Sequence, residues 1–194
     1  GLVDAAPQRE VALAAMDRDG QVAVGNVSSS LLVADPLAPF GVRTDTDAML
    51  ASVERGWDVA DVQVVELSDL ERAEEARAQS TAEQGDAQFS LALDRSDAAF
   101  GRILTGMDLS QDLVMVVGPT APVAGEELTI FGLQGPGVEP GWARSPTTRR
   151  AGFVTLTDVA PTVLDAYDVD PPSEVNDTPI VAVATSDPLA SRID

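Results

Sequence analysis

Five consecutive apolar residues, Leu-Val-Met-Val-Val at Leu113–Val117, constrain the fold more than any other segment of the chain. A short apolar run bounded by polar residues is typical of a central parallel strand that is covered on both faces. Val62–Leu67 has the β-branched composition of a second strand. Helical patterns lie between the two, and strand–helix–strand is the right-handed βαβ pattern. We therefore expect an α/β fold with a mostly parallel central sheet flanked by helices.

Helices are predicted by apolar periodicity and by capping signals. Thr44–Arg55 has acidic residues in its first turn and a glycine after its last. Ser68 and Glu71 have the spacing of a capping box, which predicts a helix from there to about Gln84. A further helix is expected at about 87–105. It carries an apolar stripe that we interpret as core, made of Phe89, Leu93, Phe100, Ile103, Leu104 and Met107.

The remaining segments are short. We expect strands at Leu128–Leu133 and Phe153–Leu156, an edge strand at Ile180–Ala184, a surface loop at Gly135–Gly141 and a helix at Thr157–Tyr167. A chain of 194 residues fits one domain. We expect residues 1–194 to form a single α/β domain in which residues 1–60 are a subsidiary cap or an N-terminal layer.

Three residue types are absent from the sequence, namely His, Cys and Lys, so all 12 basic residues are Arg. Without Cys there are no disulfides, thiol nucleophiles or thiolate metal sites. Without His the commonest general base and metal ligand is missing, and Ser-His-Asp catalysis is excluded. Without Lys there is no Schiff-base or Ser–Lys chemistry. The composition thus excludes most of the common catalytic constellations.

The formal net charge of −20 argues against long-range electrostatic attraction to nucleic acid or to anionic lipid. It is typical of a solubilising surface, and a halophilic origin would produce the same charge. No apolar run reaches the length of a membrane span. Because the chain begins with Gly-Leu rather than Met, we expect it to be truncated at the N-terminus, with a leader or anchor removed. The preference for Arg, Ala, Val and Asp points to a GC-rich genome such as that of an actinobacterium.

One segment resembles a known signature. Gly152–Pro179 contains Thr-Asp-Val-Ala-Pro-Thr-Val-Leu, which ends at Leu164, and Thr-Pro-Ile follows at Thr178–Ile180. This strand–helix piece resembles one found in the alkaline-phosphatase superfamily, which includes sulfatases and phosphodiesterases. Together with Ser145–Arg150 it is most similar to actinobacterial cell-envelope proteins related to that superfamily. The resemblance covers about Asp112 to Ile180, roughly a third of the chain.

The resemblance implies an alkaline-phosphatase-like fold whose metal site is lost. In the enzymes of the superfamily, the strand equivalent to Leu113–Val117 runs into a Ser/Thr-Asp-His-Gly turn that holds a metal ion. The turn here is Gly-Pro-Thr-Ala-Pro at Gly118–Pro122, and the chain has no His to replace the missing ligand. We therefore expect a pseudoenzyme with no metal and no cofactor. The alternative is a phosphoric or sulfuric ester hydrolase that is completed by chain outside this segment.

The candidate ligand-binding residues are Ser145, Thr147, Thr148, Arg149 and Arg150, in the run Ser-Pro-Thr-Thr-Arg-Arg. Two guanidinium groups and three hydroxyls are hydrogen-bond donors that together could hold an anion. The alternative is a surface hairpin whose arginines pair with carboxylates of the protein itself. Asp158 lies within the signature, but we interpret either Thr157 or Asp158 as the cap of the helix that follows.

The acidic clusters are not predicted to bind calcium. Asp45 with Asp47, Glu74 with Glu75, and Glu126 with Glu127 lack the spacing of a calcium loop. Asp17-Arg18-Asp19-Gly20 has no Glu at the closing position of an EF-hand loop and is interpreted as a turn.

These observations predict a non-catalytic, metal-free interaction or structural domain of a cell-envelope protein. The alternative is a binding module for an anionic envelope ligand. The expected partners are another envelope protein or an anionic glycan, and not nucleic acid. We expect an extracytoplasmic location, in the ectodomain of a membrane-anchored or secreted protein.

Overall fold

The computed structural model describes residues 11–120 and 128–186. Contacts within the chain group it into two compact units, Gly1–Met107 and Asp108–Asp194. The division follows Met107, so residues 11–60 belong to the same unit as the helices that follow them.

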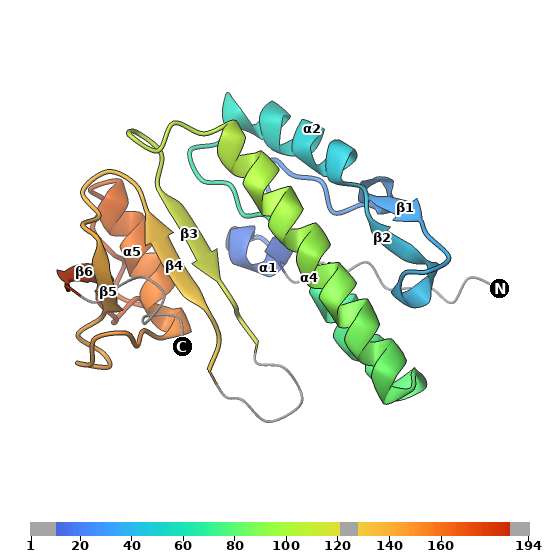
Figure 1. The fold of residues 1–194 in the computed structure, drawn as a ribbon. Coiled ribbons are helices and arrows are strands. Elements are labelled where there is room, and N and C mark those ends of the chain that lie inside the picture. The colour runs from blue at the N-terminus through green and yellow to red at the C-terminus, as the bar shows by residue number, and fades with distance from the viewer. Residues whose placement is uncertain (1–10, 121–127, 187–194) are drawn as a thin grey trace. The chain divides into compact units, whose positions relative to one another are not determined.

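The first unit combines helices with one small sheet (Figure 1). Its elements are α1 (Val11–Ala15), β1 (Leu32–Ala34), β2 (Val42–Thr44), α2 (Thr46–Trp57), α3 (Asp69–Ala76) and α4 (Ala82–Thr105). The strands β1 and β2 are antiparallel, with Val33 opposite Arg43. The three helices predicted in this unit are present, but the boundary between the second and third was wrong: α3 ends at Ala76 and not near Gln84, and α4 begins at Ala82 and not near 87.

Local capping explains where the helices begin. The Asp45 carboxylate accepts a hydrogen bond from the backbone N–H of Ala48 (3.1 Å) and so opens α2. The Thr81 hydroxyl accepts from the N–H of Gln84 (3.3 Å) and opens α4. The predicted capping box at Ser68 is not formed, because the Ser68 hydroxyl accepts from Nη1 of Arg72 (3.0 Å) instead of from the backbone.

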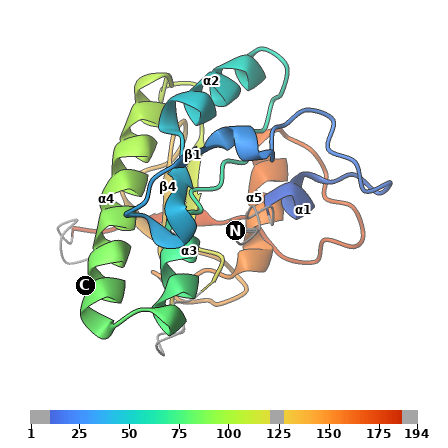
Figure 2. The ribbon, with the colours of Figure 1, turned by 90° about the vertical axis from the view of Figure 1, so that its right-hand side faces the viewer.

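The core of the first unit lies between α3 and α4, which run side by side (Figure 2). These two helices contribute four alanines with at most 7% of their surface exposed, Ala73, Ala76, Ala92 and Ala99, and α2 adds the buried Met49 and Val53. The expected apolar stripe of α4 is only partly covered, since Phe89 and Phe100 are half-buried and Leu93 is 51% exposed. Small side chains allow two helix backbones to approach closely, so the alanine face rather than the aromatic face forms the contact.

The predicted strand Val62–Leu67 is wrong. This segment is not a strand in the structure, and Val62 and Val64 are about half exposed, at 48% and 49%. β-branched residues favour an extended backbone, but a strand also needs a partner strand for its hydrogen bonds. The pairs within the described part of the chain are β1 with β2 and those of the second unit described below, and none of them includes Val62–Leu67.

The second unit contains β3 (Val114–Val117), β4 (Phe131–Gln134), β5 (Gly141–Arg144), α5 (Val159–Ala166) and β6 (Val181–Ala184). The strand β3 pairs with β4, and β5 pairs with β6 (Figure 1). Both pairs are antiparallel. The fold is mixed α/β, but the expected mostly parallel central sheet is not what the described residues form.

The correction has a physical reason. A parallel pair needs a long crossover, usually through a helix, whereas an antiparallel pair can be joined by a simple connection. No helix lies in the described part of the connection between β3 and β4, so the two strands run in opposite directions. The apolar run at Leu113–Val117 does form a strand, but its residues are only half-buried. The run therefore predicted the strand and not its pairing.

Phe153–Leu156, expected as a strand, is instead the approach to a helix. Thr155 is the N-cap of a 3₁₀ turn at Leu156–Asp158 that leads directly into α5. The expected edge strand Ile180–Ala184 is confirmed as β6, which pairs with β5. None of the helices in the described parts of the chain is both long enough and apolar enough to cross a membrane.

Candidate functional site

The segment between β5 and the start of α5 contains the five predicted site residues. We call residues Ser145–Gly152 the arginine loop. It turns back on itself through two backbone hydrogen bonds, from Arg149 N to Ser145 O (3.0 Å) and from Gly152 N to Ala143 O (2.7 Å). Arg149 and Gly152 both have positive φ, at 55° and 84°, a region that is favourable for glycine and uncommon for arginine. Such a conformation persists only where surrounding contacts hold it.

A buried carboxylate supplies those contacts. Asp158 has 0% of its surface exposed, and its Oδ1 accepts a hydrogen bond from the Thr147 hydroxyl (2.7 Å). Its Oδ2 accepts from the backbone N–H of Thr155 (2.7 Å) and from the Thr155 hydroxyl (2.8 Å). The fully buried Ser145 is a further hydrogen-bonding partner of this carboxyl. Asp158 therefore joins the arginine loop to the first turn before α5.

Two other hydroxyls extend this network. The Thr148 hydroxyl donates to the carbonyl oxygen of Phe153 (2.6 Å), which closes the far side of the loop. The Thr162 hydroxyl donates to the carbonyl oxygen of Asp158 (2.6 Å) and accepts from the N–H of Ile180 (2.9 Å). Thr162 thus ties the residue before β6 to α5 and to Asp158, the residue that holds the arginine loop.

The electrostatics of Asp158 follow from these contacts. Burial by itself would raise the pKa of the Asp158 carboxyl, because it penalises the charged form. Hydrogen bonds from the Thr147 side chain, the Thr155 backbone and the Ser145 and Thr155 side chains outweigh that penalty and hold the pKa below its ordinary value. The carboxylate is therefore charged at neutral pH and acts as an acceptor only.

Arg149 and Arg150 are exposed, and neither forms an ion pair with any of the residues that the structure describes. The guanidinium carbon of Arg150 lies over the ring of Phe153, 4.3 Å from its centroid. The first unit is different, because there most arginines are paired with carboxylates: Arg43, Arg72, Arg77, Arg95 and Arg102.

The structure thus brings all five predicted residues into one loop but divides their roles. Ser145 is buried, and the hydroxyls of Thr147 and Thr148 donate to Asp158 and to the Phe153 carbonyl oxygen. The side chains of Arg149 and Arg150 are exposed and form no ion pair with the described residues. Asp158 does stabilise the helix start, as expected, but as the third residue of a capping box whose N-cap is Thr155 and not Thr157. The sequence reasoning missed Thr155, although the spacing Thr-x-x-Asp was visible.

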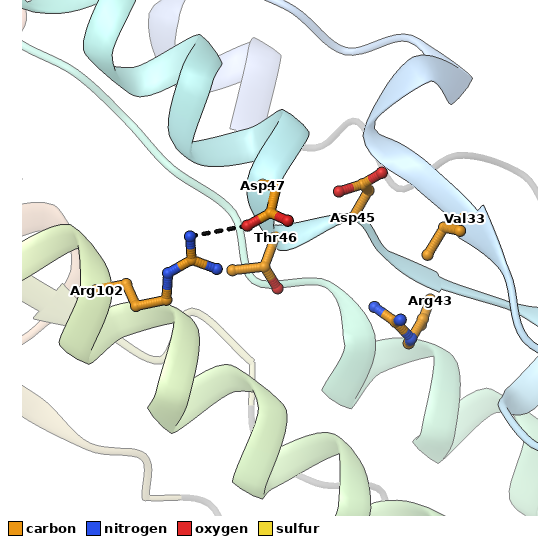
Figure 3. A pocket seen from close by; sticks show the side chains of 6 residues that line it. All are labelled: Val33, Arg43, Asp45, Thr46, Asp47 and Arg102. Carbon is orange, nitrogen blue, oxygen red and sulfur yellow. Dashed lines mark ion pairs between the residues drawn. The ribbon is translucent and has the colours of Figure 1, made fainter.

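A second candidate lies in the first unit, at the N-terminus of α2 (Figure 3). It is a cavity of about 400 Å³ lined by Val33, Arg43, Asp45, Thr46, Asp47 and Arg102. Nη2 of Arg102 pairs with Oδ1 of Asp47 (2.8 Å), and Arg43 pairs with Asp35 (3.3 Å). Since Asp45 caps the helix, the charged groups of the cavity already have partners within the protein.

The other sequence candidates give no site. In the parts of the chain that the structure describes, no three His, Cys, Asp or Glu side chains are grouped so that they could hold a metal ion. The Asp17 carboxylate accepts from the N–H groups of Asp19 and Gln21 (2.9 Å each), which confirms the predicted turn. Glu126, Glu127 and the end of the Gly118–Pro122 turn lie outside the described residues.

Comparison with protein-family models, with curated proteins and with solved structures finds no match to this chain.

Proposed function

We propose that the chain is a non-catalytic interaction domain of a cell-envelope protein with alkaline-phosphatase-like ancestry, and that the arginine loop binds an anionic envelope glycan. The observation that carries this proposal is the contrast within the loop. Its hydroxyls and the buried Asp158 hold the backbone, whereas Arg149 and Arg150 have no carboxylate partner among the described residues.

The contrast supports a binding role for physical reasons. In a chain with a net charge of −20, an arginine has many carboxylates within reach, and pairing with one would cost only side-chain entropy. The loop backbone is fixed by its internal hydrogen bonds, and the guanidinium group of Arg150 is placed over the Phe153 ring, so part of the order that an external anion needs is already present. Preorganisation of this kind lowers the entropic cost of binding.

The absence of His, Cys and Lys from the sequence supports the non-catalytic part of the proposal. The hydroxyls of the loop are poor candidates for a nucleophile, because the protons of Thr147 and Thr148 are donated to Asp158 and to a carbonyl group. Activation of a hydroxyl needs a base that can take up its proton, and the low pKa of Asp158 makes it a weak one.

Binding is tested with immobilised glycans that carry carboxylate or phosphate groups, at low ionic strength. The variant R149A/R150A should lose at least about tenfold in affinity. A matched control, R18A/R55A, removes the same charge at two exposed arginines of the first unit and should bind like the wild type. Equal losses in both variants, or no binding by the wild type, would contradict the proposed binding site.

The non-catalytic part is tested separately. The purified protein is assayed for zinc and manganese and for turnover of phosphate and sulfate esters. We expect no turnover. Stoichiometric metal together with ester hydrolysis would show that the chain is a hydrolase and overturn this part of the proposal.

A further inference from the structure

The segment Val62–Glu66, in the connection between α2 and α3, has the composition of a strand but no partner strand. None of its backbone N–H or C=O groups bonds to another backbone group in the described part of the chain. Backbone hydrogen bonds occur on either side of it, from Ala60 N to Gly56 O (3.0 Å) and from Arg72 N to Ser68 O (3.2 Å). A row of backbone groups that is left to water is a template on which another strand can pair.

Large apolar side chains on and before the segment are exposed as well. Val62, Val64 and Val65 are exposed, and Trp57 and Val59 are 39% and 62% exposed. β-branched and aromatic side chains are stabilised by cross-strand neighbours on a sheet. Five exposed large apolar residues between positions 57 and 65 therefore indicate a surface that a partner covers.

Side-chain contacts hold the segment in place without using its backbone. Oε2 of Glu66 accepts a hydrogen bond from the N–H of Val11 (3.0 Å). The side-chain amide of Gln63 lies against Gly56 of α2, where an added Cβ would be 2.5 Å from its Oε1. A partner strand would therefore meet a segment that is already partly ordered, which lowers the entropic cost of pairing.

The charges around the segment limit what can pair with it. Glu54, Asp58, Asp61 and Glu66 are acidic, and Arg55 is the only basic residue between positions 54 and 66. The whole chain has a formal net charge of −20, so a second copy would be repelled, whereas a basic segment would be attracted. The complementary partner is an extended segment in which apolar residues alternate with Arg or Lys.

We propose that Val62–Glu66 is a docking site for an extended, basic segment of a partner protein, which adds to it as a β-strand. Hydrogen bonds between the two backbones fix the register. The exposed valines pack against apolar residues of the partner, and the surrounding carboxylates attract its Arg or Lys. The site contains no residue of the arginine loop, so the inference goes beyond the proposed glycan binding and does not depend on it.

Three synthetic peptides test the docking site. The first is acetyl-Arg-Val-Thr-Val-Arg-Val-amide, the second has Glu in place of each Arg, and the third is the basic peptide with N-methyl groups on its central residues. Each is titrated into the whole chain, and the exchange of backbone amide hydrogens is followed by NMR. We expect the basic peptide to slow exchange at alternate amides of residues 62–66, because successive N–H groups of a strand point to opposite edges.

The other two peptides separate charge from strand pairing. The acidic peptide should bind at least about tenfold more weakly than the basic one. The N-methylated peptide keeps the charge but cannot donate backbone hydrogen bonds, so it should not slow exchange. Equal binding of either control peptide would overturn the inference, and so would no effect of the basic peptide at about 1 mM.

Proline variants locate the docking edge. V64P and V65P each remove one N–H that bonds to no other backbone group in the described part of the chain. Because neighbouring N–H groups point to opposite edges, one variant should bind the basic peptide about tenfold more weakly and the other should change little. The control V24P alters another exposed valine and should bind like the wild type. Wild-type binding by both V64P and V65P would overturn the inference, provided that circular dichroism shows all three variants folded.

Sedimentation of the free chain tests the competing occupant. We expect no dimer that forms through this segment. A dimer in which the amides of residues 62–66 exchange slowly without peptide would show that a second copy occupies the site, and would overturn the assignment to a basic partner.

Discussion

The Thr147 hydroxyl donates a hydrogen bond of 2.7 Å to Oδ1 of Asp158, so the arginine loop is joined directly to the turn that opens α5. The two residues are eleven positions apart in the sequence. The other oxygen of the same carboxylate accepts from the Thr155 backbone and side chain. One buried charge thus fixes both a helix start and the loop that carries Arg149 and Arg150.

Replacement of Asp158 by asparagine should destabilise the second unit by about 3 kcal/mol. An amide keeps the size of the side chain but replaces one acceptor oxygen by a donor group. That donor would face Thr147 or the Thr155 N–H, which themselves donate to Asp158 in the wild type. Urea unfolding followed by circular dichroism measures the change in the free energy of unfolding.

The control for this prediction is D177N. The Thr147 hydroxyl also approaches Oδ1 of Asp177, but at 3.4 Å, and that contact is exposed. We expect a loss below about 0.5 kcal/mol, as for an ordinary surface substitution. Similar losses in D158N and D177N would contradict the role assigned to the buried carboxylate.

Acid should weaken the second unit through the same group. The pKa of Asp158 lies below its ordinary value of 3.8 in the folded protein. The stabilisation is therefore complete above the unfolded pKa and is lost as the pH falls through the folded pKa. We expect the free energy of unfolding to decrease as the pH falls below about 4, the unfolded pKa of an aspartate.

The D158N variant isolates the contribution of Asp158 to this pH dependence. Asp35 and Asp108 also have lowered pKa values, owing chiefly to hydrogen bonds from the Leu37 backbone and the Ser110 side chain, and they titrate in both proteins. The difference in stability between wild type and D158N should therefore shrink as the pH falls. A difference that stays constant from pH 7 to about pH 2 would show that Asp158 does not titrate with unfolding.

The helices of this chain could be predicted because their signals are local. Asp45 and Thr81 precede α2 and α4 as N-caps, and Gly106 follows α4 directly. Each of these residues acts on backbone groups a few positions away, so a short window of sequence contains the cause.

Strand pairing could not be predicted in the same way. Leu113–Val117 and Val62–Leu67 have similar apolar, β-branched compositions, yet only the first contains a strand. Whether a segment becomes a strand depends on a partner elsewhere in the chain, and composition does not identify that partner. β3 pairs with β4 in an antiparallel register. The βαβ prediction was therefore wrong because it depended on which distant segment becomes the partner strand.

The residues of the candidate site could be predicted from the sequence, but the separate roles of their side chains could not. Ser145, Thr147, Thr148, Arg149 and Arg150 were named from the sequence as one cluster. Which of their groups remains available depends on where each hydroxyl proton goes, and that is decided by Asp158 and by the Phe153 carbonyl group. These partners lie five to eleven residues away, on the other side of a turn.

The first unit contains a buried ion pair that we expect to be sensitive to substitution. Nη2 of Arg72 contacts Oδ1 of Asp69, and the two side chains are 3% and 10% exposed. The same Asp69 oxygen accepts from the N–H of Thr44 (2.9 Å), which ties α3 to β2. R72A would leave the Asp69 charge buried with one cation fewer, and should cost about 3–5 kcal/mol in urea unfolding.

Its matched control is R102A, which breaks an exposed pair. The side chains of Arg102 and Asp47 are 53% and 84% exposed, so water screens their attraction. The expected loss is at most about 1 kcal/mol. An R102A loss as large as that of R72A would contradict the distinction between the two pairs.

Gly152 is the residue at which a single methyl group should disturb the arginine loop most directly. Its φ is +84°, and a Cβ there would lie 3.0 Å from Cε3 of Trp142. Gly137 has a similar φ of +73°, but a Cβ there would meet nothing within 4 Å. Both alanine variants carry the cost of a left-handed backbone, about 1–2 kcal/mol. Only G152A must also displace an aromatic ring, so it should lose about 1–3 kcal/mol more. Urea unfolding of the two variants measures that difference, and equal losses would show that Trp142 yields without cost.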